Sequence, residues 1–354
     1  MTAPAGKSFD PPSRAGRKSA LQALSAAKYS ANTSAHRTTV AMISAGPSRS
    51  LRPSLTCLFF ITRSSCAVDE FDASDPDVWV FPVGTRIWKE FSFAGRRIET
   101  RYMERGTDGA WRYATYQWTE AQDDAIRCDK ARHVPLASSR QHWIPAEVDC
   151  RSCHEGRSTP VLGFDLLQLS PDTDPLALHR GEPSRDEVDL GKLVRSGHLR
   201  GLPSRYLDHQ PRIETANVVE RAARGYLHGN CGYCHNAEGP LASLGMDLAF
   251  HSTDAVGARL RSSTIGRASR FALQSPTLAQ HRVMPGDVDA SVLSRRMHAR
   301  DPITKMPPIG TTVTDDEALA LIDLWIDSMP AVVPARPGSN DTRPIPTAHE
   351  KESP

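Results

Sequence analysis

Apolar and polar positions alternate through residues 78–118, and this pattern predicts an antiparallel β-meander. Aromatic and β-branched residues are concentrated in 85–93, 98–103 and 111–118, which we expect to be strands. The segments between them, Ala94-Gly95 and Gly106-Thr-Asp-Gly109, are typical of turns. The aromatic side chains fit either a platform for a ligand or the buried face of a small sheet, and we favour the buried face.

The clearest helical pattern lies near the C-terminus. Thr314 and Glu317 have the spacing of a capping box, and Asp315 and Asp316 add negative charge to the first turn. A single apolar stripe follows, formed by Leu319, Ile322, Trp325, Ile326 and Met329. Helical patterns also occur through much of 214–330, and a short helix is expected over 187–196.

Composition separates the 354 residues into a folded middle and two irregular ends. Residues 1–66 hold nine Lys or Arg residues, a single acidic residue and no persistent periodicity, so we expect a leader without a fold. The remainder carries 34 basic and 40 acidic residues, which argues against a nucleic-acid-binding protein. No run of 18 apolar residues occurs, so we expect no ordinary membrane-spanning helix. Five prolines in 331–354 indicate a disordered tail.

The strongest chemical signal is a five-residue pattern that occurs twice. Cys150-Arg-Ser-Cys153-His154 and Cys231-Gly-Tyr-Cys234-His235 both place a histidine directly after a Cys-x-x-Cys pair. This pattern is typical of the covalent attachment of a c-type haem. The four cysteines would form thioether bonds to two porphyrins, and the two histidines would each bind an iron.

Two other interpretations of the cysteine pairs explain less. Structural zinc sites also use paired cysteines, but their pairs usually lie about 15–20 residues apart. Here 77 residues separate Cys153 from Cys231. Neither zinc binding nor a catalytic dithiol accounts for the histidine that follows both pairs.

Met306 is the expected second axial ligand opposite His235. The segment Lys305-Met-Pro-Pro-Ile-Gly310 precedes the predicted terminal helix, and its prolines stiffen the loop that presents the sulfur. Methionine opposite histidine raises the reduction potential of a c-type haem. The alternative is that Met306 fills a gap in the core.

The first motif has no such loop, because no methionine lies between His154 and His235. We select His198 as the nominal second ligand there. The other candidates are His133, His142, His179, His209 and Met103. The position could also be open, and this matters because an open iron binds small molecules, whereas an iron with two protein ligands only transfers electrons.

These residues carry a family resemblance. The segment 222–227, the second motif, Met306-Pro-Pro and the terminal helix resemble a class I cytochrome c domain. Gly225, Tyr226 and Trp325 match the small and aromatic residues at which two helices cross in that fold. Over 78–330 the chain also resembles a group of bacterial di-haem c-type cytochromes, through Pro82-Val-Gly-Thr85, Ile98-Glu-Thr-Arg101, Trp143-Ile-Pro, Leu162-Gly-Phe and Pro285-Gly-Asp.

The resemblance implies an exported, periplasmic protein that carries single electrons between a dehydrogenase and a downstream acceptor. The alternative is a di-haem peroxidase or oxidase with an open or labile site at the first haem. A third interpretation makes the β-rich segment a recognition module for a sugar or for a partner enzyme. Each interpretation requires protein redox partners, and none involves nucleic acid.

The expected architecture is α+β. A β-rich domain (68–141) precedes a first haem-binding segment (142–213) and a mainly helical cytochrome c-like domain (214–330). Export would use a signal that starts at Met42 and has its apolar region at 55–61. Cys57 and Cys66 would then belong to the leader, with Cys66 a weak candidate for lipidation and membrane association. Cys128 would remain as a buried, unreactive thiol.

Overall fold

The structure is a computed structural model that describes residues 38–43, 70–93, 95–136, 141–172, 174–178, 188–271 and 280–331. The fold is mixed α+β, with antiparallel sheets and seven α-helices in these residues. Most of the expected leader, with Cys57 and Cys66, lies outside the described residues, as do His179 and the expected tail from 332 onward.

The main sheet has five strands in the order β1-β4-β5-β6-β7, all antiparallel. Its strands are β1 (Thr38–Ile43), β4 (Arg86–Phe93), β5 (Arg96–Arg105), β6 (Trp111–Trp118) and β7 (Ala125–Arg127). The three central strands are the predicted meander. Gly95 and Gly109 have φ angles of 79° and 78° in the turns between them, a left-handed conformation that favours glycine.

Strand β1 was not expected. The composition of 1–66 predicts no fold, yet residues Thr38–Ile43 form an edge strand that pairs with residues 86–91 of β4. The sequence signal was missed because six residues carry too little periodicity to stand out in a polar surrounding. An edge strand also obtains most of its stabilisation from the neighbouring strand rather than from its own pattern.

Two smaller sheets flank the meander. Strands β2 (Phe71–Asp75) and β3 (Val78–Val80) pair antiparallel, and β10 (Leu199–Arg200) joins β2 in parallel. Strands β8 (Arg132–Pro135) and β9 (Gln141–Ile144) form a hairpin that leads into the first motif.

The helices include the first motif and the first residue of the second, and most of them lie in the second half of the chain. They are α2 (Glu147–His154), α3 (Leu190–Arg195), α4 (Arg205–Asp208), α5 (Val218–Cys231), α6 (Ala258–Thr264), α7 (Val292–His298) and α8 (Asp316–Ser328), with a 3-10 helix, η2 (Ala242–Leu244). Among the described residues, no helix combines the length and the apolar character needed to cross a membrane.

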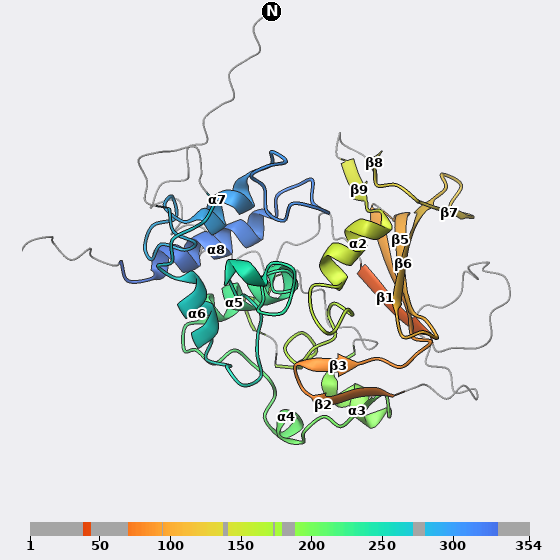
Figure 1. Ribbon diagram of the computed structural model, residues 1–354, viewed down its shortest axis with the longest axis horizontal. Helices are drawn as coiled ribbons and strands as arrows, with labels where there is room; N and C mark the ends of the chain where they lie inside the picture. Colours follow the sequence, from red (N-terminus) through yellow and green to blue (C-terminus); the bar gives the residue numbers. More distant parts are fainter. Residues whose placement is uncertain are drawn as a thin grey trace, which may run out of the picture.

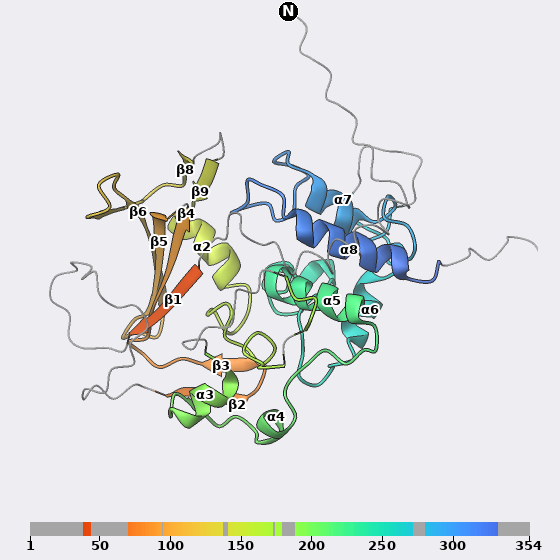
Figure 2. The ribbon, with the colours of Figure 1, turned by 180° about the vertical axis from the view of Figure 1, so that it is seen from behind.

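The sheet and the helices α5–α8 occupy opposite sides of the molecule, and α2 lies between them (Figure 1). The reverse view shows the same order, with β2, β3, α3 and α4 grouped at one end (Figure 2). The first motif, on α2, is therefore placed at the centre of the molecule, between the sheet and the helical half.

Two large hydrophobic clusters hold these parts together. The first joins β2, β3 and the meander to the segment after α2, and it includes Phe81, Tyr113, Cys150 and Leu166. Phe250, from the second half of the chain, also belongs to it. The β-rich segment and the first motif therefore share one core, rather than each having a core of its own.

The second cluster is helical and packs α5 against α8. Ala222, Ala223 and Leu227 on α5 lie in one cluster with Leu319, Ile322, Trp325 and Ile326 on α8, and Met329 packs against it. This confirms the predicted apolar stripe. The predicted capping box is wrong by one position, because Asp315 is the N-cap and its carboxylate accepts a hydrogen bond from Ala318 N at 3.1 Å.

The assignment of Gly225 as the small residue at the helix crossing is also corrected. A Cβ atom at Gly225 would meet only Ile213 Cδ1, at 4.0 Å, and Ile213 is not part of α8. Ala222 and Ala223 are the small residues within the cluster that joins the two helices. Tyr226 does reach the start of α8, where its hydroxyl donates to Asp315 Oδ2 at 3.2 Å.

Candidate functional site

The first motif forms the C-terminal half of α2. Two acidic residues lie in the first turn of this helix, where they interact favourably with its dipole. Asp149 Oδ2 also accepts a hydrogen bond from Ala146 N at 2.9 Å, which holds the start of the helix. Arg151 bridges Glu147 and Glu155 on the exposed side, at 2.8 and 2.9 Å. The cysteines and His154 are left to face the interior.

Cys150 faces the central sheet. Its Sγ lies 4.0 Å from Thr115 Oγ1 on β6, and the residue is 8% exposed. Burial raises the pKa of this thiol above its ordinary value. The sheet therefore forms one wall of the surroundings of the first motif.

The imidazole of His154 is held by a backbone carbonyl. Its Nδ1 lies 2.7 Å from Pro160 O, and its ring centroid lies 5.4 Å from that of Tyr113. Burial lowers the pKa of His154 to about 4, and the positive charges of Arg101 and Lys89 act in the same direction. The ring is therefore neutral at physiological pH. A carbonyl bond at one nitrogen of a neutral ring is the arrangement that orients metal-binding histidines through the other nitrogen.

The second motif begins where α5 ends. Asn217 caps the helix by accepting hydrogen bonds from Val219 N and Glu220 N, and Cys231 is the last helical residue. Burial raises the pKa of Cys231 to about 12. The turn that follows brings His235 under the helix, and its backbone N–H bonds to Cys231 O at 2.9 Å.

His235 is 8% exposed, and its Nδ1 has no hydrogen-bond partner within the described residues. Burial lowers its pKa, and the nearby guanidinium groups of Arg296 and Arg282 lower it further. Both motif histidines are thus neutral rings in a positively charged environment.

The two motifs meet, although 76 residues lie between them. The thiols of Cys153 and Cys234 are hydrogen-bonding neighbours, which raises the pKa of Cys153 and lowers that of Cys234. Cys234 Sγ also lies 3.6 Å from Ser152 O. No disulfide joins the five cysteines that the structure describes.

Asn236 fastens this junction from within. Its side chain is 3% exposed, and its amide nitrogen lies within 3.0 Å of three carbonyl oxygens, those of Gly156, Gly232 and Tyr233. Gly156 follows the first motif by two residues, so a single side chain binds the backbone just after the first motif and the backbone within the second.

Glycine at 156 is required by this contact. A Cβ atom there would overlap the carbonyl oxygen of Tyr233, and one at Gly239 would overlap the carbonyl oxygen of Gly156. The two backbones are therefore in direct van der Waals contact. Sequence patterns gave no indication of this contact, because its two sides lie far apart in the sequence.

A second connection joins the segment after the first motif to α5. His228 is 1% exposed, its Nδ1 accepts from Phe250 N at 2.9 Å, and its Nε2 lies 3.1 Å from Asp165 Oδ2. The bond from Phe250 fixes the tautomer, so Nε2 donates to the carboxylate. Tyr233 adds a further bond, because its hydroxyl donates to Gln168 Oε1 at 2.6 Å.

Met306 lies in a loop anchored on α7. Its backbone N–H donates to Arg296 O at 2.9 Å, and Arg296 Nε donates to Thr304 O at 2.8 Å. Arg296 is also one of the two arginines whose charge affects His235. The loop thus starts beside a residue that borders the second motif, and the role of Met306 as a ligand stays a prediction.

His198 lies in the turn after α3. Its Nδ1 is 2.6 Å from Ser196 Oγ, and its carbonyl accepts from Phe71 N on β2 at 2.8 Å. These contacts lie in the group formed by β2, β3 and α3, whereas His154 lies on α2. His133 packs against Trp143 with a centroid distance of 4.7 Å, and His209 is exposed at the end of α4.

Two other candidates for the first motif lie on the sheet face that α2 covers. Met103 is 6% exposed and pairs in register with Tyr113, the residue in contact with His154. His142 Nε2 lies 2.6 Å from Oε2 of the fully buried Glu99. The structure therefore places Met103 and His142 closer to the setting of the first motif than His198.

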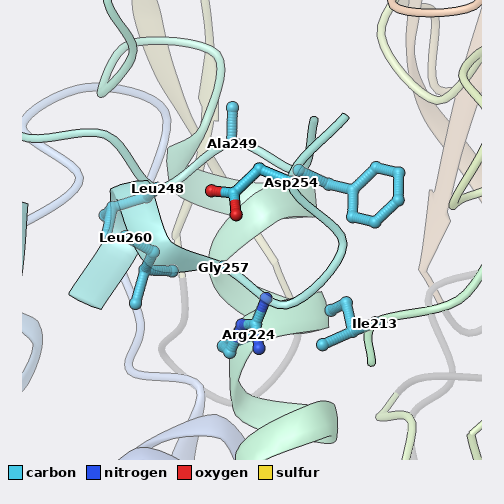
Figure 3. Close-up of a pocket in the computed structure, with 8 residues that line it drawn as sticks. Ile213, Arg224, Leu248, Ala249, Asp254, Gly257 and Leu260 are labelled. Carbon is cyan, nitrogen blue, oxygen red and sulfur yellow. The ribbon is translucent and has the colours of Figure 1, made fainter. Parts of the chain in front are cut away.

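The cavities differ greatly in size. One, shown in Figure 3, is bordered by Arg224, Gly257 and Leu260 and holds about 10 Å³, roughly the space of one water molecule. The Arg224 guanidinium fills most of the region through bonds to Val256 O and Ala255 O. This cavity is a packing gap.

A larger cleft of about 400 Å³ opens beside the junction of the motifs. Its wall includes Arg157 after the first motif, residues 236–238 after the second, and the turn between β2 and β3. Acidic and basic side chains both line it. It is the route by which solvent approaches the junction from this side.

No group of three or more His, Cys, Asp or Glu side chains in the described part of the chain is arranged to hold a metal ion by itself. Cys128 is 4% exposed, and burial raises its pKa. The prediction that this thiol is buried is confirmed.

Searches of protein-family models, of curated proteins and of solved structures found no match to the chain.

Proposed function

We propose that this protein is an exported di-haem c-type cytochrome that transfers single electrons between a dehydrogenase and a downstream acceptor. The observation that supports this proposal most directly is that the two Cys-x-x-Cys-His motifs meet at the Cys153–Cys234 contact. Groups attached to these two sulfurs would be immediate neighbours. Adjacent redox groups exchange electrons rapidly, which suits a carrier that accepts from one protein and donates to another.

The residues present fit this cofactor. All four motif cysteines are free thiols. The ring of His154 is oriented by Pro160 O, and His235 has a buried nitrogen with no partner in the described residues. A c-type haem, when bound, supplies one-electron chemistry at its iron. The chain would contribute attachment through Cys150, Cys153, Cys231 and Cys234, with axial ligands from His154, His235 and Met306.

The surroundings of both motifs would tune that chemistry. Arg101 and Lys89 act on His154, and Arg296 and Arg282 act on His235. Positive charge disfavours the oxidised, more positive state of a bound iron. The chain would therefore favour the reduced form at both sites, and Met306 as an iron ligand would add to this at the second.

Haem content tests the proposal directly. The full chain is expressed together with the c-type haem maturation machinery, and covalent haem is counted by the pyridine haemochrome method. We expect two haems in the wild type, one in the Cys150→Ala/Cys153→Ala variant, one in the Cys231→Ala/Cys234→Ala variant, and two in the control Cys128→Ala. Protein without covalent haem, or with stoichiometric zinc, would overturn it.

One observation favours a second candidate, a di-haem peroxidase. Glu99, His142 and Arg101 form a hydrogen-bonded group on the sheet face that α2 covers. Such a group can move a proton and stabilise negative charge beside a small molecule. Carbon monoxide added to the reduced protein separates the two functions, since binding at one haem indicates an open site and supports the peroxidase.

A further inference from the structure

The sheet face toward the first motif carries charge where a core would be apolar. Residues that pair in register point to the same side of a sheet. Ile87 pairs with Met103, Lys89 with Arg101, and Phe91 with Glu99. The first pair is buried and apolar, whereas the next two rows bring two cations and one carboxylate to the same face.

This face adjoins the first motif. Thr115, the partner of Arg101 on β6, contacts Cys150, and Tyr113 contacts His154. The positive charges of Arg101 and Lys89 act to lower the pKa of His154, and that of Arg101 also acts to lower the pKa of Cys153. The two cations therefore border the space in which a group attached to the first motif would lie.

Only one of the two cations has a carboxylate partner. Arg101 binds Glu99 through two hydrogen bonds, at 2.6 and 3.2 Å. Lys89 forms no ion pair in the described part of the chain, and its ammonium group lies 5.2 Å from the centroid of the Phe91 ring. The Arg101 guanidinium lies over the same ring, at 4.4 Å. Lys89, Arg101 and Glu99 together carry one uncompensated positive charge.

Lys89 is exposed but stands beside other charges. Desolvation by the surrounding protein lowers its pKa, repulsion from Arg101 lowers it further, and the carboxylate of Glu99 acts in the opposite direction. Placing two cations side by side is unfavourable without enough negative charge to balance them. A single carboxylate would neutralise the excess charge, whereas a dianion would overcompensate it.

We propose that Lys89 and Arg101 form a carboxylate-binding site next to the first motif. The inference rests on the proposed function only for the source of the carboxylate, which is either a propionate of the first haem or a small free acid. In both cases Lys89 supplies a point charge and the part of the Arg101 fork not used by Glu99 supplies directed N–H groups. Phe91 and the apolar row at Ile87 and Met103 provide the adjoining non-polar wall.

Redox titration of the dialysed, full-length protein tests the site. Lys89→Gln removes the unpaired charge, Lys89→Arg retains it, and Lys130→Gln removes a charge from an exposed position as a matched control. If the carboxylate is a propionate, Lys89→Gln lowers one of the two midpoint potentials and leaves the other unchanged. Lys89→Arg and Lys130→Gln then match the wild type, and added formate has no effect.

If the carboxylate is a free acid, loss of the Lys89 charge again lowers one potential of the dialysed protein, but formate now shifts that potential of the wild type with saturation. Lys89→Gln then weakens formate binding at least tenfold. Equal potentials and equal formate responses in wild type and Lys89→Gln would overturn the site. If the chain carries no haem, the proposed function fails, and formate is tested by thermal unfolding. Stabilisation of the wild type but not of Lys89→Gln supports the site, and equal behaviour rejects it.

Discussion

Nε2 of His228 donates a hydrogen bond to Asp165 Oδ2 at 3.1 Å, and this bond joins two segments that are 63 residues apart. Burial opposes the ionisation of Asp165, but the interaction with His228 and the backbone N–H of Gln168 lower its pKa below the ordinary value. The carboxylate is thus ionised in the folded protein and is part of what holds the segment after the first motif against α5.

Asp165→Asn should destabilise the protein by about 1–3 kcal/mol near neutral pH, the usual cost of losing a buried hydrogen bond to a charged group. Because the folded pKa of Asp165 is lowered, its contribution is present above the unfolded carboxyl pKa of about 4 and is lost as pH falls through the folded value. Denaturant unfolding at neutral and acidic pH measures both effects. Asp172→Asn, which affects a more exposed pair with Arg212, is the control and should change little. A loss independent of pH would contradict the assignment.

Asn236→Ala should weaken the junction of the two motifs. Three carbonyl oxygens would lose the amide that now binds them, and we expect a loss of roughly 2–3 kcal/mol in the free energy of unfolding. Asn230→Ala is the matched control, because that exposed asparagine donates to a single carbonyl on its own helix. Equal effects of the two substitutions would show that the junction does not depend on Asn236.

Gly156→Ala should disrupt the same junction by steric overlap with Tyr233 O, at a cost of about 1–3 kcal/mol or more. Gly225→Ala has space for the added methyl group and lies inside α5, so it should stabilise the protein by up to about 1 kcal/mol. Thermal unfolding of both variants gives the comparison. A stable Gly156→Ala protein would mean that the two backbones do not touch.

Met306→Leu should remove the weak red absorption band that oxidised, methionine-ligated haem displays, and it should lower the potential of one haem. Leucine has a similar volume but no sulfur, so packing is largely retained. Met329→Leu, at the end of α8, is the control and should leave spectrum and potentials unchanged. If Met306→Leu also leaves both unchanged, Met306 fills space rather than binding iron.

Local patterns account for much of the fold. The three central strands, the turns at Gly95 and Gly109 and the terminal helix follow from short-range periodicity and from glycine, and all of them occur in the structure. The N-cap was predicted at Thr314 but lies at Asp315. Both positions carry suitable side chains, and only tertiary contacts, such as the bond from Tyr226, decide between them. Edge strand β1 was not predicted, because its own pattern is short and its pairing partner is distant in sequence.

The candidate site was predictable in its chemistry but not in its assembly. Both motifs are visible as sequence patterns, whereas their contact depends on Gly156 and Asn236. The role of these two residues can be recognised only when the two distant segments are seen together in the structure. A signal for the charged sheet face was present, since Lys89 lies between Ile87 and Phe91 at alternate strand positions. Charged residues are common on exposed faces of strands, so alternation alone did not show that this face points inward.

The tight junction at Gly156 also constrains the order of assembly. The thiols of Cys153 and Cys234 face each other where the two backbones touch. Any chemistry on these sulfurs has to be complete before the segments close, because the closed form leaves no room for a catalyst to enter between them. The first motif precedes the second along the chain, so such chemistry can proceed in two stages, with closure of the junction as the final step.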